Sequence, residues 1–149
     1  MKYTLLTPDA FNKQLLSSPA QYSYYKTDVG LLKLYLTDDS IYQAFFCDEE
    51  PSNLLIRLPT QLLISGTPFQ ISVWQAALQI PAGKTATYQE IAHAIGRPKA
   101  WRAVANALGS NKIAYFIPCH RVLRSNGALG GYKWGIERKQ KLLKKESLN

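Results

Sequence analysis

The sequence predicts an α+β fold in two parts, an antiparallel β-sheet domain followed by a helix-turn-helix domain. Short runs rich in Tyr, Leu, Ile and Phe fill the first part, whereas apolar residues recur at helical spacing after residue 66. The basic residues are concentrated in the second part. A chain of 149 residues, 46% hydrophobic and 19% charged, can form one ordinary domain or two small ones with packed cores.

The first part is expected to be a small antiparallel sheet, with strands over residues 22–28, 31–37 and 41–47. Asp38-Asp39-Ser40 separates the last two strands and is typical of a hairpin turn. We expect a helix over residues 9–16 with Asp9 as its N-cap. Residues 54–64 are apolar but contain Pro59, which favours an edge strand or an extended linker.

Gly66-Thr67-Pro68 is the expected boundary between domains 1–65 and 66–149, because a breaker, an N-cap residue and a helix-starting proline occur together. Three helices should follow, over residues 68–80, 87–96 and 98–109. Thr87 and Glu90 form a capping-box pattern at the start of the second. The turn Gly96-Arg97-Pro98 makes the last two a candidate helix-turn-helix, although an ordinary helical hairpin in a core fits too.

The rest of the second part completes a winged-helix plan. Residues 113–117 are apolar and strand-like, and Asn126-Gly127 predicts a hairpin. A last helix is expected over residues 135–146.

The charge distribution favours a polyanionic partner. The first 74 residues carry five Lys or Arg and seven Asp or Glu, and the remaining 75 carry 13 and three, so the net charge of +8 comes entirely from the second half. The third helix has four alanines and, beyond Lys99 at its start, a single long cation, Arg102, a composition that suits close approach to a backbone better than base reading in the major groove. Those alanines could equally pack inside the protein.

Other functional classes are excluded by composition. No apolar run is long enough to span a membrane, and the N-terminus lacks a secretion signal. Two distant cysteines and two histidines give neither a disulfide framework nor a zinc-ligand spacing. We therefore expect a cytoplasmic protein.

Cys119 beside His120 is a candidate pair of nucleophile and base. Side chains of neighbouring residues in a strand point to opposite faces, so the pair needs an irregular backbone or a bridging water. A buried core cysteine is the alternative. Glu146 continues the apolar stripe of the last helix and could pair with a histidine, or with Lys139, Lys144 or Lys145.

Ile117-Pro118-Cys119-His120-Arg121-Val122 resembles the active-site signature of the O6-alkylguanine-DNA alkyltransferases, the methylated-DNA–protein-cysteine methyltransferases. The resemblance extends over residues 66–146, through the segments Gly66–Gln70, Val73-Trp74, Gly83–Thr85, Thr87-Tyr88, Pro98–Ala100, Arg102–Val104, Asn111, Gly130–Tyr132 and Glu146. It is strongest toward the methyltransferase half of the bacterial adaptive-response regulator. Residues 1–65 resemble the family's ribonuclease-H-like N-terminal domain only loosely.

The resemblance implies direct-reversal DNA repair, in which Cys119 irreversibly takes the alkyl group from O6 of a flipped guanine, once per protein molecule. It assigns catalysis to Cys119, His120, Glu146 and Asn111. It assigns DNA binding to Arg102, Tyr88, Ala103, Ala105 and Lys99, with Arg102 replacing the flipped base. It assigns the substrate pocket to Val122, Tyr132, Lys133, Trp134 and Leu108.

The expected partner is double-stranded DNA with alkylated bases, bound by a monomer without cofactor or metal, so that the protein would be associated with the nucleoid. The zinc site that some relatives carry lacks its ligands here. Trp134, where some relatives have glycine, should narrow the pocket. Activity on O4-methylthymine stays open. The alternatives are a non-enzymatic alkylguanine-binding protein, whose relatives have tryptophan in place of Cys119, and a winged-helix transcription regulator.

Overall fold

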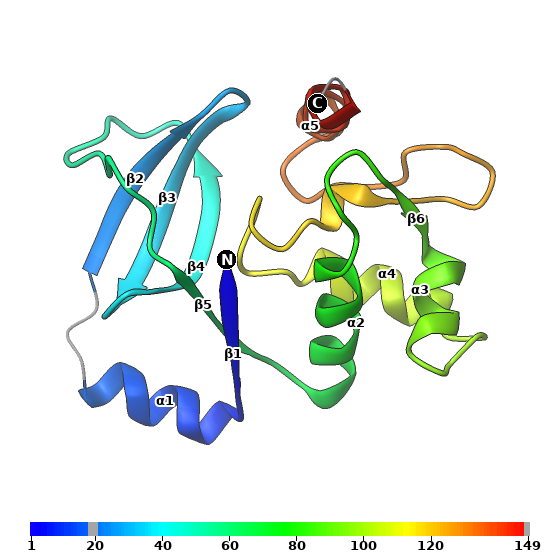
Figure 1. The fold of residues 1–149 in the computed structure, drawn as a ribbon, viewed down its shortest axis with the longest axis horizontal. Helices are drawn as coiled ribbons and strands as arrows, with labels where there is room; N and C mark the ends of the chain where they lie inside the picture. Colours follow the sequence, from blue (N-terminus) through cyan, green and yellow to red (C-terminus); the bar gives the residue numbers. More distant parts are fainter. Residues whose placement is uncertain (18–20, 148–149) are drawn as a thin grey trace. The chain divides into compact units, whose positions relative to one another are not determined.

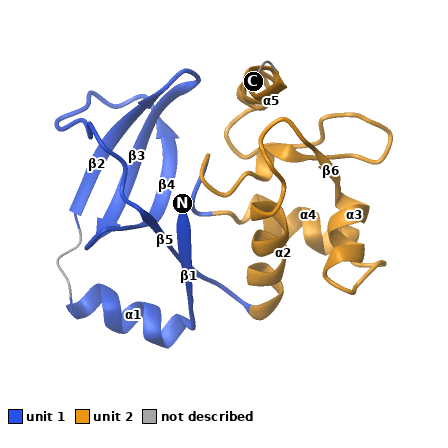
Figure 2. Cartoon of the chain, viewed as in Figure 1, with its two compact units in different colours: residues 1–67, 112–114 blue, residues 68–111, 115–149 orange. Residues whose placement is uncertain are grey.

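The computed structural model describes residues 1–17 and 21–147. The chain divides into two compact units, the first of residues 1–67 and 112–114 and the second of residues 68–111 and 115–149 (Figure 2). Over the described ranges, no helix is both long enough and apolar enough to cross a membrane. The mixed helix and strand content agrees with the predicted α+β class.

The first unit is built on a five-stranded sheet in the order β1-β5-β4-β3-β2 (Figure 1). Its strands are β1 (Lys2–Leu6), β2 (Gln21–Thr27), β3 (Gly30–Thr37), β4 (Ser40–Cys47) and β5 (Gln61–Ser65). The three predicted strands and the hairpin between the last two are confirmed to within one residue.

The prediction of a purely antiparallel sheet is wrong, because β5 pairs in parallel with both β1 and β4. β5 is therefore an interior strand, not the edge strand or linker expected over residues 54–64. Its residues Leu62, Leu63 and Ile64 are all buried, the pattern of a strand covered on both faces. Pro59 lies before the strand begins, so it does not interrupt the ladder.

Helix α1 (Pro8–Ser17) lies between β1 and β2 in the chain. Its predicted cap is wrong by two residues: Thr7 Oγ1 accepts a hydrogen bond from the Ala10 backbone N–H at 3.2 Å, and Asp9 lies in the first turn. The helix contacts the sheet through Phe11, whose ring packs edge-on against that of Tyr42 with the two ring centres 5.8 Å apart.

The second unit contains α2 (Pro68–Leu78), α3 (Tyr88–Ala94), α4 (Trp101–Gly109) and α5 (Ile136–Ser147). The first three pack against one another, and Trp74 Nε1 in α2 donates to the carbonyl of Ala107 in α4 at 2.8 Å. The capping box at Thr87 and Glu90 is confirmed by both of its hydrogen bonds. Helix α4 begins at Trp101 and not near Pro98, because a separate turn, closed by Ala100 N–H to the Arg97 carbonyl, precedes it.

Two strand predictions in the second part are wrong. Residues 113–117 form no strand: Ile113 makes a single bridge to Ala44, and Tyr115 has a left-handed φ of 74°, which ends any extended run. At Asn126-Gly127 the turn forms, with Arg124 N–H donating to the Ala128 carbonyl at 2.9 Å, but no strand lies between it and α5. β7 (Val122–Leu123) pairs instead in parallel with β6 (Ala86–Thr87).

Candidate active site in the second unit

Cys119 and His120 lie in a single 3-10 turn, Cys119–Arg121, instead of a strand. Cys119 N–H donates to the Ile117 carbonyl at 2.8 Å, and Arg121 N–H donates to that of Pro118 at 3.0 Å. Both side chains are buried, with Cys119 7% and His120 2% exposed. The backbone is thus irregular at the place where the alternation of a strand would have separated the two side chains.

Helix α5 brings Glu146 against this turn. Glu146 Oε1 lies 2.5 Å from His120 Nε2. Arg121 contacts the same carboxylate through two nitrogens: Nε lies 2.8 Å and Nη2 2.7 Å from Oε2, and Nε also lies 3.1 Å from Oε1. Arg121 Nη1 also donates to the Ile80 carbonyl at 2.7 Å. Of the two alternatives for Glu146, the structure has the histidine pairing.

The carboxylate determines which nitrogen of His120 carries a proton. Burial raises the pKa of Glu146, but hydrogen bonds from His120 and Arg121 outweigh burial and hold it at about 2. An ionised carboxylate only accepts hydrogen bonds, so Nε2 must donate. In a neutral imidazole the lone pair is then on Nδ1. Nδ1 is buried and has no hydrogen-bond partner among the residues that the structure describes.

Cys119 is in an environment that keeps the thiol protonated. Burial raises its pKa from 9.0 to about 12, and the hydrogen bond with the Asn111 side chain and the positive charge of Lys139 offset only part of that rise. The side chain of Asn111 is fully buried, and its Nδ2 donates to the Ile117 carbonyl at 3.3 Å. Because only a thiolate is strongly nucleophilic, a thiol in this environment would react only with a base close by.

Lys139 is fully buried and links two backbone segments through three carbonyl groups. Its ammonium donates to the carbonyls of Val122 at 2.7 Å, Leu129 at 2.5 Å and Gly131 at 3.1 Å. Three acceptors match the three donors of an ammonium group. Burial opposes the charge and lowers the pKa of Lys139 to about 8. The lysine therefore joins β7 to the loop that follows the Asn126-Gly127 turn.

A cavity of about 320 Å³ opens beside Cys119. Its lining includes Cys119, Tyr88, Ala105, Leu108, Gly131, Tyr132, Lys133 and Trp134. The rings of Tyr132 and Trp134 pack edge-on with their centres 5.4 Å apart, and Lys133 Nζ also lies 5.4 Å from the centre of the Trp134 ring. Val122, which was expected at the pocket through its backbone, has a fully buried side chain, and its carbonyl accepts a hydrogen bond from Lys139.

Tyr88 stands at the cavity beside the loop that follows β7. A Cβ added to Gly130, which has a φ of +72°, would lie 2.7 Å from the Tyr88 hydroxyl. Glycine at this position thus allows the loop to lie directly against the ring. Burial raises the pKa of Tyr88, so its hydroxyl is kept as a hydrogen-bond donor.

Tyr88, at the start of α3, is one of the residues expected to bind DNA, and the other four lie on or just before α4. Lys99, Arg102 and Ala103 are exposed, and Ala105 is half-buried and lines the cavity. The Arg102 guanidinium lies 5.0 Å from the centre of the Trp101 ring. Within the described chain, no three His, Cys, Asp or Glu side chains gather as metal ligands.

Sequence reasoning missed the roles of Arg121 and Lys139. Arg121 directly follows the Cys119-His120 pair, so a turn that buries those two also brings the arginine to their carboxylate partner. Lys139 lies three residues from both Ile136 and Leu142, on the apolar stripe of the last helix. A cation on a buried stripe requires partners, and that spacing could have identified it.

Comparison with known proteins places the chain in a family. The model of the 6-O-methylguanine DNA methyltransferase DNA-binding domain matches residues 68–148, more than half of the chain. The chain belongs to the 6-O-methylguanine DNA methyltransferase family. A crystal structure of Mycobacterium tuberculosis OGT in complex with DNA resembles this family member, with a TM-score of 0.74 and 34% identity. The match covers 85% of the present chain and 92% of the OGT chain.

Curated proteins include relatives of this family member. The regulatory protein ada of Salmonella typhimurium is 56% identical over 95 residues, which cover 64% of this chain and 26% of that protein. The methylated-DNA–protein-cysteine methyltransferase of Methanosarcina barkeri is 53% identical over 89 residues, which cover 60% of this chain and 56% of that protein. The matched region thus covers about a quarter of the first relative and about half of the second.

Proposed function

We propose that this protein repairs alkylated double-stranded DNA by direct reversal, moving the alkyl group from O6 of a guanine to Cys119. The observation that carries the proposal is a buried thiol, next to a carboxylate-held imidazole, at the wall of a cavity. Membership of the methyltransferase family supports the same reaction. The transfer uses no cofactor, and each molecule acts once because the thioether product is stable.

His120 acts as the base for Cys119. Glu146 and Arg121 hold the imidazole so that its Nδ1 lone pair is available, and Nδ1 is shielded from solvent. A thiol with a pKa of about 12 is deprotonated at neutral pH only if its proton has a nearby acceptor. A water molecule bridging the sulfur and Nδ1 carries the proton.

In the transfer, the Cys119 sulfur attacks the alkyl carbon in line with its bond to O6. The new bond is S–C, and the C–O6 bond breaks with its electron pair going to the guanine. The guanine takes up one proton, which replaces the one lost by the thiol, and leaves as an ordinary base. The Tyr88 hydroxyl, whose pKa is raised by burial, donates a hydrogen bond to the guanine ring as this charge develops.

Access to a base edge inside a duplex requires the guanine to leave the stack. Arg102 is the side chain that replaces it, being long, cationic and exposed at the start of α4. The small residues Ala103 and Ala105 let α4 approach the minor groove, and Lys99 contacts a phosphate. Most of the affinity should come from phosphates and should fall as salt rises.

We further propose a ribonuclease-H-like domain over residues 1–65 and a winged-helix-like, DNA-binding domain over residues 66–149. The mixed sheet of the first unit and the pair α3 and α4 of the second support this assignment. The protein acts as a monomer in the cytoplasm, at the nucleoid. Val122 contributes to the pocket through its backbone.

The proposal is tested by replacing each of the two free cysteines in turn. With a duplex carrying one radiolabelled O6-methylguanine, Cys119→Ala should transfer no label to protein and still bind the duplex. Cys47→Ala, the matched control, should transfer normally. Label on Cys119→Ala protein would move the acceptor elsewhere and refute the assignment.

A further inference from the structure

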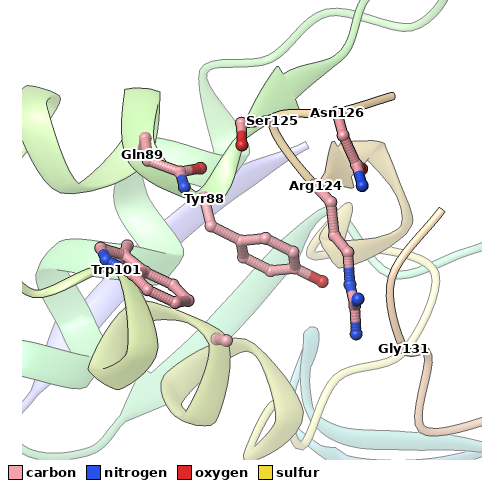
Figure 3. Close-up of a pocket in the computed structure, with 8 residues that line it drawn as sticks. Tyr88, Gln89, Trp101, Arg124, Ser125, Asn126 and Gly131 are labelled. Atoms are coloured by element: carbon pink, nitrogen blue, oxygen red, sulfur yellow. The ribbon is translucent and has the colours of Figure 1, made fainter. Parts of the chain in front are cut away.

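The second unit has a further cavity of about 480 Å³, whose lining residues are drawn in Figure 3. Tyr88, Ala105 and Gly131 line both cavities, so the two are neighbours with Tyr88 in their common wall. The reaction proposed above uses only the first cavity. The volume of the second cavity falls within the range of small-molecule binding sites in proteins.

The lining of the second cavity combines the groups that bind a nucleotide. Trp101 supplies an aromatic face and Arg124 a guanidinium, and Figure 3 shows them on opposite sides of the Tyr88 ring. Gln89 also lines the cavity, and its Oε1 is shielded from solvent without a hydrogen-bond partner in the described part of the chain. A shielded acceptor is satisfied when a ligand brings an N–H or O–H donor.

Trp101 is a large aromatic residue that is left partly exposed at the start of α4. Its side chain is 39% exposed, and the guanidinium of Arg102 lies over its ring. In the proposed reaction Arg102 leaves this position to enter the duplex, which uncovers the indole face beside the cavity. An uncovered indole can stack on a base of any identity, and stacking suits a protein that must act at any sequence.

We propose that the second cavity binds the nucleotide next to the alkylated guanine on the same strand, with its base stacked on Trp101 and its phosphate paired with Arg124. This inference rests on the proposed function. The shared wall requires the occupant to be a neighbour of the extruded guanine, and a covalent neighbour is present in every substrate. Trp101 and Arg124 are then binding residues, and Gln89 accepts a hydrogen bond from the neighbouring nucleotide.

Small substrates test this subsite without the cost of base flipping. Cys119 alkylation is followed by mass spectrometry with O6-methyl-2′-deoxyguanosine and with the two dinucleotides that add one nucleotide on its 5′ or its 3′ side. One dinucleotide should react about tenfold faster than the nucleoside, the scale of one stacked base. That ratio should fall to near one in Trp101→Ala, persist in Trp101→Phe and drop severalfold in Arg124→Gln.

The controls are Tyr22→Ala, an exposed aromatic of the first unit, and Arg57→Gln, an exposed arginine of the same unit, and both should keep the wild-type ratio. Equal rates for the nucleoside and both dinucleotides would overturn the subsite while leaving the transfer reaction standing. A dinucleotide advantage that survives Trp101→Ala would overturn it too. If neither small substrates nor lesion duplex alkylate Cys119, the proposed function fails first, and the subsite with it.

Discussion

Replacing Glu146 with glutamine removes one negative charge and leaves the size of the side chain almost unchanged. The pKa of Glu146 lies at about 2 in the folded protein against a usual 4.5. The folded state therefore prefers the carboxylate over the neutral acid by about 3 kcal/mol, at 1.36 kcal/mol for each pH unit of that difference. Glutamine imitates the neutral acid, so Glu146→Gln should unfold more easily by about 3 kcal/mol at pH 7.

The stabilisation that Glu146 contributes should depend on pH in one direction, falling as the pH is lowered. A carboxyl group whose pKa is lowered on folding stabilises the protein above the unfolded-state pKa, and that contribution is lost as pH falls through the folded-state value. The difference in unfolding free energy between wild type and Glu146→Gln should thus shrink below pH 4.5 and nearly vanish near pH 2. Urea denaturation of both proteins between pH 7 and pH 3 measures it.

The matched control is Glu137→Gln, an exposed glutamate in the first turn of the same helix, which should change stability by less than about 0.5 kcal/mol. The same Glu146→Gln variant should alkylate Cys119 slowly, by about a hundredfold, because a neutral amide no longer fixes the imidazole tautomer. A difference in stability that is independent of pH, or below about 1 kcal/mol, would refute the buried ion-pair reasoning.

Three further changes test other parts of the site. Gly130→Ala should slow transfer severalfold by displacing Tyr88, since the new Cβ would lie 2.7 Å from the Tyr88 hydroxyl. The control is Gly127→Ala, whose backbone is equally strained but whose Cβ would have no neighbour within 4 Å, so that it should transfer normally. Equal rates for the two variants would remove the steric argument. Arg102→Ala should slow repair of duplex DNA far more than transfer from the free base, and comparable losses would end its flipping role. Trp134→Gly should raise the benzyl-to-methyl rate ratio, and an unchanged ratio would show that Trp134 does not narrow the cavity.

Local signals in the sequence were enough for several elements of the fold. Clear turn residues separate the strands β2 to β4, and Thr87 and Glu90 have the spacing of a capping box. The three strands and the helix cap were therefore predicted. β1 and the parallel pairings of β5 were not, because parallel partners are far apart in the chain and leave no turn signal between them.

The proposed catalytic residues show the same division between local and distant contacts. Cys119 and His120 are neighbours in the sequence, so the need for an irregular backbone at this point could be predicted, and the structure has a 3-10 turn there. Glu146 was open to several partners until α5 was placed against the turn. Arg121 and Lys139 were missed because their partners, a shared carboxylate and three backbone carbonyls, come together only in the folded chain.

The most direct test is intact-protein mass spectrometry after mixing with a duplex that carries a single O6-methylguanine, followed by peptide mapping. Direct reversal predicts one added methyl group per protein molecule, located on Cys119, with no further gain when the lesion duplex is in excess. An unchanged mass despite tight binding to the lesion would contradict the transfer reaction. It would leave this protein as one that recognises alkylguanine without repairing it.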